Sequence, residues 1–237
     1  MNKMIITLDL DWAAEAAIEE TLSTLENMGI SPTVFITHRS KAVEKRMDSL
    51  EVGLHPYFDE SSSHGRTIDE TVAHIMSLPH NLKAYRCHRF QSSNLSDQAM
   101  VERGMLISSN VCTDLEVIPP FKNRFGILEV PIFMEDGGCL WRNHPLEGNN
   151  PLQNALRLDG IKVLLIHPMH FMLNTPDFSY MASIKKSLTR YAWNHLSLND
   201  LENMRWKGRG IRDLCLEILT LHKSHYKGIF RTLGSLL

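Results

Sequence analysis

The fold is decided by a stretch at the start of the chain, Met4-Ile-Ile-Thr-Leu-Asp-Leu-Asp11. Residues 4–8 form a short apolar run, which predicts a strand that is buried on both faces. The run ends at Asp9, and Asp11 follows two residues later. Because side chains two residues apart in an extended chain share a face, both carboxylates can point to one place. Close like charges are stabilised by a cation between them, so the pair predicts a cation site; an N-terminal helix cap by Asp11 is the alternative.

Strand and helix patterns alternate along the rest of the chain. The predicted strands are 32–37, 50–54, 82–87, 105–108, 126–130, 161–166 and 228–232, and the predicted helices are 13–28, 40–49, 67–78 and 96–103, with a mostly helical final part. This alternation predicts parallel strands, in a barrel or in a doubly wound sheet. No glycine-rich phosphate loop follows the first strand, which disfavours a dinucleotide-binding fold. We find no linker or repeat within the 237 residues and expect one domain over 1–237.

The composition is typical of a globular protein and disfavours several classes. With 43% hydrophobic residues, 22% charged residues and a net charge of −2, the chain lacks the basic surface of a nucleic-acid-binding protein. It has no apolar run of about 18 residues, so we expect no transmembrane segment. The four cysteines form no C-x-x-C pair, and the first residues do not resemble a secretory signal. These features predict a cytoplasmic protein without a cysteine-zinc site.

Polar side chains cluster at the ends of four predicted strands. They are Asp9 and Asp11, His55, Arg86 and His88, and His167. In parallel α/β barrels the catalytic groups lie at the carboxyl ends of the strands, where the loops converge. A charged group at a buried strand end needs a metal, a partner or a ligand. The pattern therefore predicts an active site at this rim.

Two imidazoles and one carboxylate, from His55, His64 and Asp11, form a set that suits zinc and leaves positions open for water. His64 lies in a polar, loop-like segment, 56–66, where a solvent-exposed histidine is the alternative. His167 and His170 could likewise be buried structural groups.

Together these motifs resemble the polysaccharide deacetylase superfamily, also called carbohydrate esterase family four, over nearly the whole chain. The matching segments are Thr7–Asp11 for the first motif, Glu51–His55 for the start of the second, Tyr85–His88 for the third and Leu164–His167 for the last. The resemblance implies a distorted (β/α) barrel of about seven parallel strands. It also implies a metal-dependent hydrolase that removes an acetyl or similar acyl group from an N-acylated sugar or polysaccharide precursor.

The resemblance also implies a role for each matched residue. Asp9 corresponds to the catalytic base, Arg86 to the residue that orients it, and His167 to the general acid. Asp136, in a loose match to the family's fourth motif, could polarise His167.

The metal ligands implied by the resemblance are Asp11, His55 and His64. The expected cofactor is a divalent metal, zinc first, with nickel or cobalt as alternatives. Three residues usually separate the family's two histidines, whereas eight residues separate His55 from His64. Asp59 lies at the usual spacing and is an alternative ligand.

Several further residues near the motifs are candidates for substrate binding. They are Trp12, Tyr57, His88, Trp141 and His170, and Phe171 could stack on a sugar or belong to the core. His88 replaces the proline of the third motif. The implied partner is a carbohydrate, and a cytoplasmic location favours a soluble or lipid-linked sugar precursor. Hydrolysis of another acyl or formyl amide, and a catalytically inactive carbohydrate-binding relative, are the alternatives.

Overall fold

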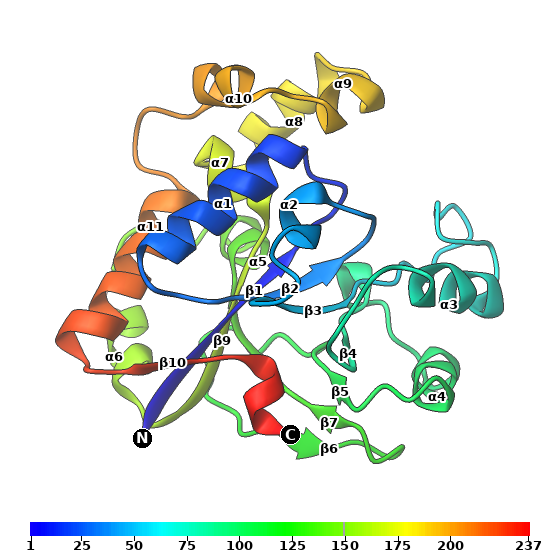
Figure 1. Ribbon diagram of the computed structural model, residues 1–237. Coiled ribbons are helices and arrows are strands. Elements are labelled where there is room, and N and C mark those ends of the chain that lie inside the picture. Colours follow the sequence, from blue (N-terminus) through cyan, green and yellow to red (C-terminus); the bar gives the residue numbers. More distant parts are fainter. Residues whose placement is uncertain (149) are drawn as a thin grey trace.

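The computed structural model describes residues 1–148 and 150–237, which fold around one curled sheet (Figure 1). Its strands are β1 (Asn2–Asp9), β2 (Thr33–Ile36), β3 (Glu51–Leu54), β4 (Ala84–Tyr85), β5 (Ile107–Ser108), β6 (Phe121–Lys122), β7 (Leu128–Glu129), β8 (Ile132–Glu135), β9 (Gly160–Ile166) and β10 (Ile229–Arg231). Their order across the sheet is β6-β7-β5-β4-β3-β2-β1-β9-β8, and β10 pairs with the start of β1.

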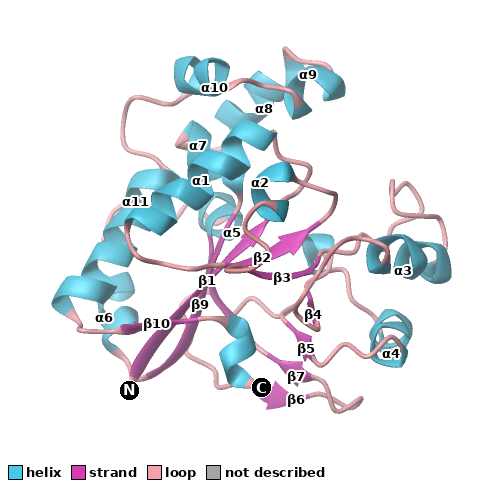
Figure 2. Ribbon diagram, in the orientation of Figure 1, coloured by secondary structure: helices cyan, strands magenta, loops and turns pink. Residues whose placement is uncertain are grey.

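Helices cover the sheet, and several more extend over one end of it (Figure 2). They are α1 (Glu15–Asn27), α2 (Lys41–Glu44), α3 (Ile68–Met76), α4 (Asn94–Glu102), α5 (Asp136–Trp141), α6 (Asn150–Arg157), α7 (Pro168–Leu173), α8 (Phe178–Lys186), α9 (Arg190–Asn194), α10 (Leu198–Met204) and α11 (Ile211–Thr220), with the short turns η1 (His88–Phe90), η2 (Leu221–His225) and η3 (Leu233–Leu236). None of the described helices is long and apolar enough to cross a membrane.

The sheet closes on itself through the segment 128–135. Its first part, β7, pairs with β5, and its second part, β8, pairs with β9; both pairings are parallel. An isolated bridge between Cys112 and Ile132 continues the closure, and the Ile132 amide donates to the Val111 carbonyl at 2.8 Å. The strands β1 to β5, this segment and β9 therefore occupy seven positions in a ring. The predicted distorted barrel of about seven parallel strands is confirmed.

The apolar run at the start of the chain is buried on both faces of β1, as predicted. Met4, Ile6 and Leu8 belong to the large hydrophobic cluster beneath the helices, whereas Ile5 belongs to a second cluster formed with inward-facing residues of the other strands. Since side chains alternate along a strand, Asp9 lies on the same face as Ile5. The interior of the barrel thus becomes polar at the carboxyl end of β1.

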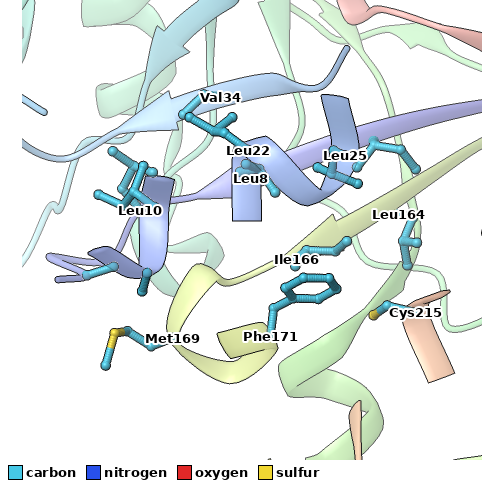
Figure 3. Packing of buried hydrophobic residues seen from close by; sticks show 14 of the residues in the cluster. Leu8, Leu10, Leu22, Leu25, Val34, Leu164, Ile166, Met169, Phe171 and Cys215 are labelled. Carbon is cyan, nitrogen blue, oxygen red and sulfur yellow. The ribbon is translucent and has the colours of Figure 1, made fainter. Parts of the chain in front are cut away.

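The large cluster fixes the helices α1, α7 and α11 against the sheet. Figure 3 shows Leu8 and Leu22 close to Val34, and Ile166 above Phe171. Phe171 is completely buried, so it is a core residue and cannot stack on a substrate. Burying a side chain of this kind stabilises the fold by about 2 to 3 kcal/mol.

The predicted boundaries differ from the structure mainly where strands are short. Both β4 and β5 have only two residues in strand geometry, against six and four predicted. The strand β8 and the helix α5 were not predicted, although they carry part of the site described below.

Candidate active site

A cleft of about 890 Å³ opens where β1, β3, β8 and β9 end. Its floor contains the strand-end residues that the sequence singled out: Asp9, Asp11, His55, His88 and His167. Its walls include residues of α8 and α9, among them Lys185 and Trp193. The carboxyl rim of the barrel is therefore the candidate active site, as the sequence predicted.

Two imidazoles converge on one carboxylate oxygen at the centre of this cleft. The Asp11 Oδ1 atom lies 3.0 Å from His55 Nε2 and 2.9 Å from His88 Nδ1. One ligand atom from each of the three side chains lies within 4.8 Å of the others. Burial alone would raise the pKa of Asp11, but the charge of His167 and the hydrogen bonds to His55 and His88 hold it well below its usual range.

The backbone adopts an uncommon conformation to place these groups. Asp11 and Trp12 have φ angles of 45° and 53°, and Arg89 and Phe90, which follow His88, have φ angles of 56° and 55°. Positive φ values are rare for residues other than glycine and cost of order 1 kcal/mol or more each. Such strain is common at functional sites, where the surrounding structure holds it in place.

The structure does not bring His64 to this cluster. Its Nδ1 atom accepts a hydrogen bond from the Tyr57 amide at 3.2 Å, and its Nε2 atom lies 2.9 Å from the Thr37 carbonyl. Both ring nitrogens are thus occupied by the backbone, and burial lowers the pKa of His64 to about 4. His64 therefore fastens its loop to the end of β2, and His88 occupies the third position in the cluster. Asp59, the alternative ligand, instead accepts a hydrogen bond from the Ser61 amide at 2.9 Å.

Arg86 holds Asp9 at the edge of the cluster. Arg86 is completely buried, and its Nη1 atom donates to Asp9 Oδ1 at 2.9 Å and to Thr7 Oγ1 at 2.8 Å. The Nε and Nη2 atoms donate to the carbonyl and the hydroxyl of Ser109 at 2.9 and 2.8 Å. The other Asp9 oxygen, Oδ2, lies 3.7 Å from His55 Nε2. One oxygen is therefore fixed by a cation, while the other faces the cluster.

His167 forms a second oriented pair, with Asp136. Its Nδ1 atom lies 2.5 Å from Asp136 Oδ1, and its backbone amide donates to Asp136 Oδ2 at 2.7 Å. The free Nε2 atom lies 3.5 Å from Asp11 Oδ2. Burial would lower the pKa of His167, but the Asp136 and Asp11 carboxylates raise it well above its usual value. The expected contact between Asp136 and His167 is present, and it presents a protonated imidazole to the cleft.

The predicted substrate-binding residues divide into two groups. Trp12, Trp141 and His170, together with His88 of the cluster, line the cleft. Tyr57 does not line it; its ring packs edge-on against Trp12 and His88, with ring centroids 6.0 and 4.6 Å away. Tyr57 therefore supports two cleft residues from behind.

The structure also places in the cleft several residues that the sequence analysis did not identify. They are Arg89, Lys185 and Trp193. Glu135, which precedes Asp136 in the loose match to the fourth motif, also lines the cleft, and burial raises its pKa. The apolar run before Glu135 and Asp136 repeats the pattern that ends β1. No sequence signal marks Lys185 or Trp193, whose placement depends on how α8 and α9 fold over the rim.

Known proteins agree with this architecture. The barrel resembles the solved structure of a Bordetella bronchiseptica protein, WbmS, assigned as a polysaccharide deacetylase involved in O-antigen biosynthesis. The two sequences are 22% identical, and the TM-score is 0.79 over 92% of this chain and 90% of that one. An assigned polysaccharide deacetylase from Mycobacterium smegmatis is 15% identical, with a TM-score of 0.50 over 70% of this chain and 76% of that one. No curated protein sequence matches the chain significantly. The family model for WbmS-like polysaccharide deacetylases matches residues 6–185, and the chain therefore belongs to that family.

Proposed function

We propose that this protein is a metal-dependent hydrolase that removes an acetyl or similar acyl group from an N-acylated sugar. The observation that carries the proposal is the convergence of His55 and His88 on Asp11, between a carboxylate held by arginine and an imidazole held by Asp136. A base, an acid and a set of metal ligands thus share one cleft. Membership of the polysaccharide deacetylase family supports a carbohydrate substrate.

The donor set fits a divalent metal such as zinc. Two imidazole nitrogens and one carboxylate oxygen are preferred zinc ligands, and three protein ligands leave positions open for water and substrate. Asp11, His55 and His88 would hold the metal; nickel and cobalt also accept this set. When bound, the metal would act as a Lewis acid that activates water and polarises the acyl carbonyl.

Asp9 and His167 suit the two proton transfers of amide hydrolysis. The Asp9 Oδ2 atom faces the cluster, while the Arg86 guanidinium holds Oδ1 and keeps the carboxylate oriented as a general base. Burial would lower the pKa of His167, but Asp136 and Asp11 raise it above its usual value. This favours the protonated imidazole, whose Nε2 can give a proton to the leaving nitrogen. Base and acid thus both border the proposed metal ligands, Asp9 at 3.7 Å from His55 and His167 at 3.5 Å from Asp11.

The first test is metal content together with turnover. We expect elemental analysis to find about one divalent metal per chain, and a large loss of it in Asp11→Ala and His88→Ala. The matched control is His64→Gln, which changes a histidine outside the cluster and keeps the metal. Loss of metal in His64→Gln but not in His88→Ala would overturn this ligand set.

Turnover is measured as acetate released from N-acetylated sugars. Removing Asp9 or His167 should slow release about 100-fold or more while the metal stays bound. If formate or another acid is released from the correspondingly acylated sugars instead of acetate, the proposed acetyl group is replaced by that other acyl group. Metal binding without turnover of any acylated sugar would favour the catalytically inactive, carbohydrate-binding alternative.

A further inference from the structure

Not every charged side chain that lines the cleft has a partner in an ion pair. Asp9 is paired with Arg86, and Arg142 lies 3.1 Å from Asp114. Arg89 and Lys185 also line the cleft, yet in the described part of the chain neither has a carboxylate within ion-pair distance. Two cations are therefore available to a ligand.

These two cations line the same cleft as the Asp11 cluster. Burial lowers the pKa of Lys185, the Asp11 carboxylate raises it and the Arg89 charge lowers it, so the three charges influence one another. Its ammonium lies 5.0 Å from the centre of the Trp193 ring, and the Arg89 guanidinium lies 5.7 Å from the centre of the Tyr57 ring. Aromatic faces beside both groups restrict their positions, although each keeps donors free. Two like charges that face one space repel each other, and an anion between them relieves that repulsion.

The remaining cleft surface suits a sugar. The Trp12 and Trp193 rings also line the cleft, and aromatic rings provide apolar faces for pyranose rings. A further cation, Arg190, lies 5.9 Å from the centre of the Trp12 ring and adds to the positive potential there.

We infer that the substrate is an anionic sugar, whose phosphate or carboxylate is bound by Arg89 and Lys185 while its acylamino group lies at the Asp11 cluster. This inference rests on the proposed function for the identity of the reacting group. A neutral polymer of N-acetylated sugars would leave both cations without a partner, so the geometry favours a charged monomer or a charged residue within a polymer.

Binding of three probes tests the inference without requiring turnover. Calorimetric titration of the full chain uses N-acetylglucosamine 1-phosphate, N-acetylglucosaminuronic acid and neutral N-acetylglucosamine. We expect at least one of the two anionic sugars to bind about 10-fold or more tightly than the neutral sugar, because charge-assisted hydrogen bonds are strong. Whichever anionic sugar binds more tightly shows whether phosphate or carboxylate is recognised. Equal binding of all three probes, or no binding of either anionic sugar, would overturn the inference.

Two variants test whether Arg89 and Lys185 cause the preference for anionic sugars. Lys185→Met and Arg89→Gln should each weaken binding of the preferred anionic sugar about 10-fold and change neutral-sugar binding little. The matched control is Lys186→Met, which removes the adjacent lysine that does not line the cleft and should leave binding unchanged. A preference for anionic sugars that persists in both cleft variants but disappears with EDTA would assign the anion to the metal and refute the role of the cations. Failure to release acetate would count against the proposed function alone, since binding is read separately.

Discussion

Replacing Arg86 by methionine should remove much of the stability of the fold. The change leaves the Asp9 carboxylate, whose side chain is only 2% exposed, without its cation. It also removes the donors to Thr7 and Ser109. Removing one partner of a buried ion pair costs about 3 to 5 kcal/mol, because the remaining charge stays desolvated. We therefore expect Arg86→Met to lower the free energy of unfolding by about that amount.

The assay is urea-induced unfolding in EDTA at pH 7, followed by tryptophan fluorescence and circular dichroism. The variants are Arg86→Met, Asp9→Leu and their combination. The double variant buries no unpaired charge, so it should be more stable than the sum of the two single effects predicts, by about 2 kcal/mol or more. The control is Arg39→Met, which breaks an ion pair between Arg39 and Glu44. The Arg39 side chain is 71% exposed, so this change should leave the stability nearly unchanged.

Additivity of the two single variants within about 0.5 kcal/mol would refute the reasoning. It would mean that Arg86 and Asp9 stabilise the fold independently. A loss below about 1 kcal/mol in Arg86→Met would show that water or a rearranged side chain replaces the guanidinium.

Three further predictions concern single groups. In Asp136→Asn, the carboxylate that opposes the effect of burial on His167 is removed, so the pKa of His167 should fall. NMR titration in EDTA measures this pKa, and an unchanged value would contradict the assigned pairing. The pKa of His64 is about 4 in the folded state against 6.5 in the unfolded chain, so the unfolded state takes up more protons between these values and the protein loses stability as pH falls from about 6.5 towards 4. At about 1.4 kcal/mol per pH unit the loss is at most about 3 kcal/mol, and His64→Gln should show a smaller dependence on pH in urea unfolding. A Cβ atom at Gly53 would lie 2.7 Å from the Ala84 carbonyl oxygen, so Gly53→Ala should lower thermal stability by about 1 to 3 kcal/mol, and an unchanged melting temperature would mean that β3 and β4 can separate.

The sequence was sufficient to predict which strand ends bring polar side chains to the cleft. A buried apolar run that ends in a polar side chain is a local pattern, and it identified Asp9, His55 and His167 without knowledge of the fold. It also placed Arg86 and His88 together, because both follow β4. The seven-position ring was predicted through the family resemblance rather than from periodicity, which left a doubly wound sheet equally possible.

The proposed metal-ligand set could not be read from the sequence. His64 is closer to His55 along the chain than His88 is, but the loop 56–64 turns back so that its imidazole contacts the Thr37 carbonyl. His88 reaches Asp11 because the curvature of the barrel brings the end of β4 towards the end of β1. Which of two histidines meets a carboxylate is thus decided by tertiary structure, and spacing along the chain does not contain that information.

The segment 128–135, which closes the barrel, has a consequence for how this protein can vary. The Val130 carbonyl accepts a hydrogen bond from the Ser109 hydroxyl that supports Arg86, and Asp136 follows the same segment directly. One short apolar piece of chain therefore supports both proposed proton-transfer groups indirectly, through Ser109 and Arg86 for Asp9 and through Asp136 for His167. A substitution that displaces this piece is expected to disturb the supports of both groups even where the barrel still folds. We therefore expect substitutions at Val130 and Ile132 to reduce turnover as well as stability, although these interior residues do not line the cleft.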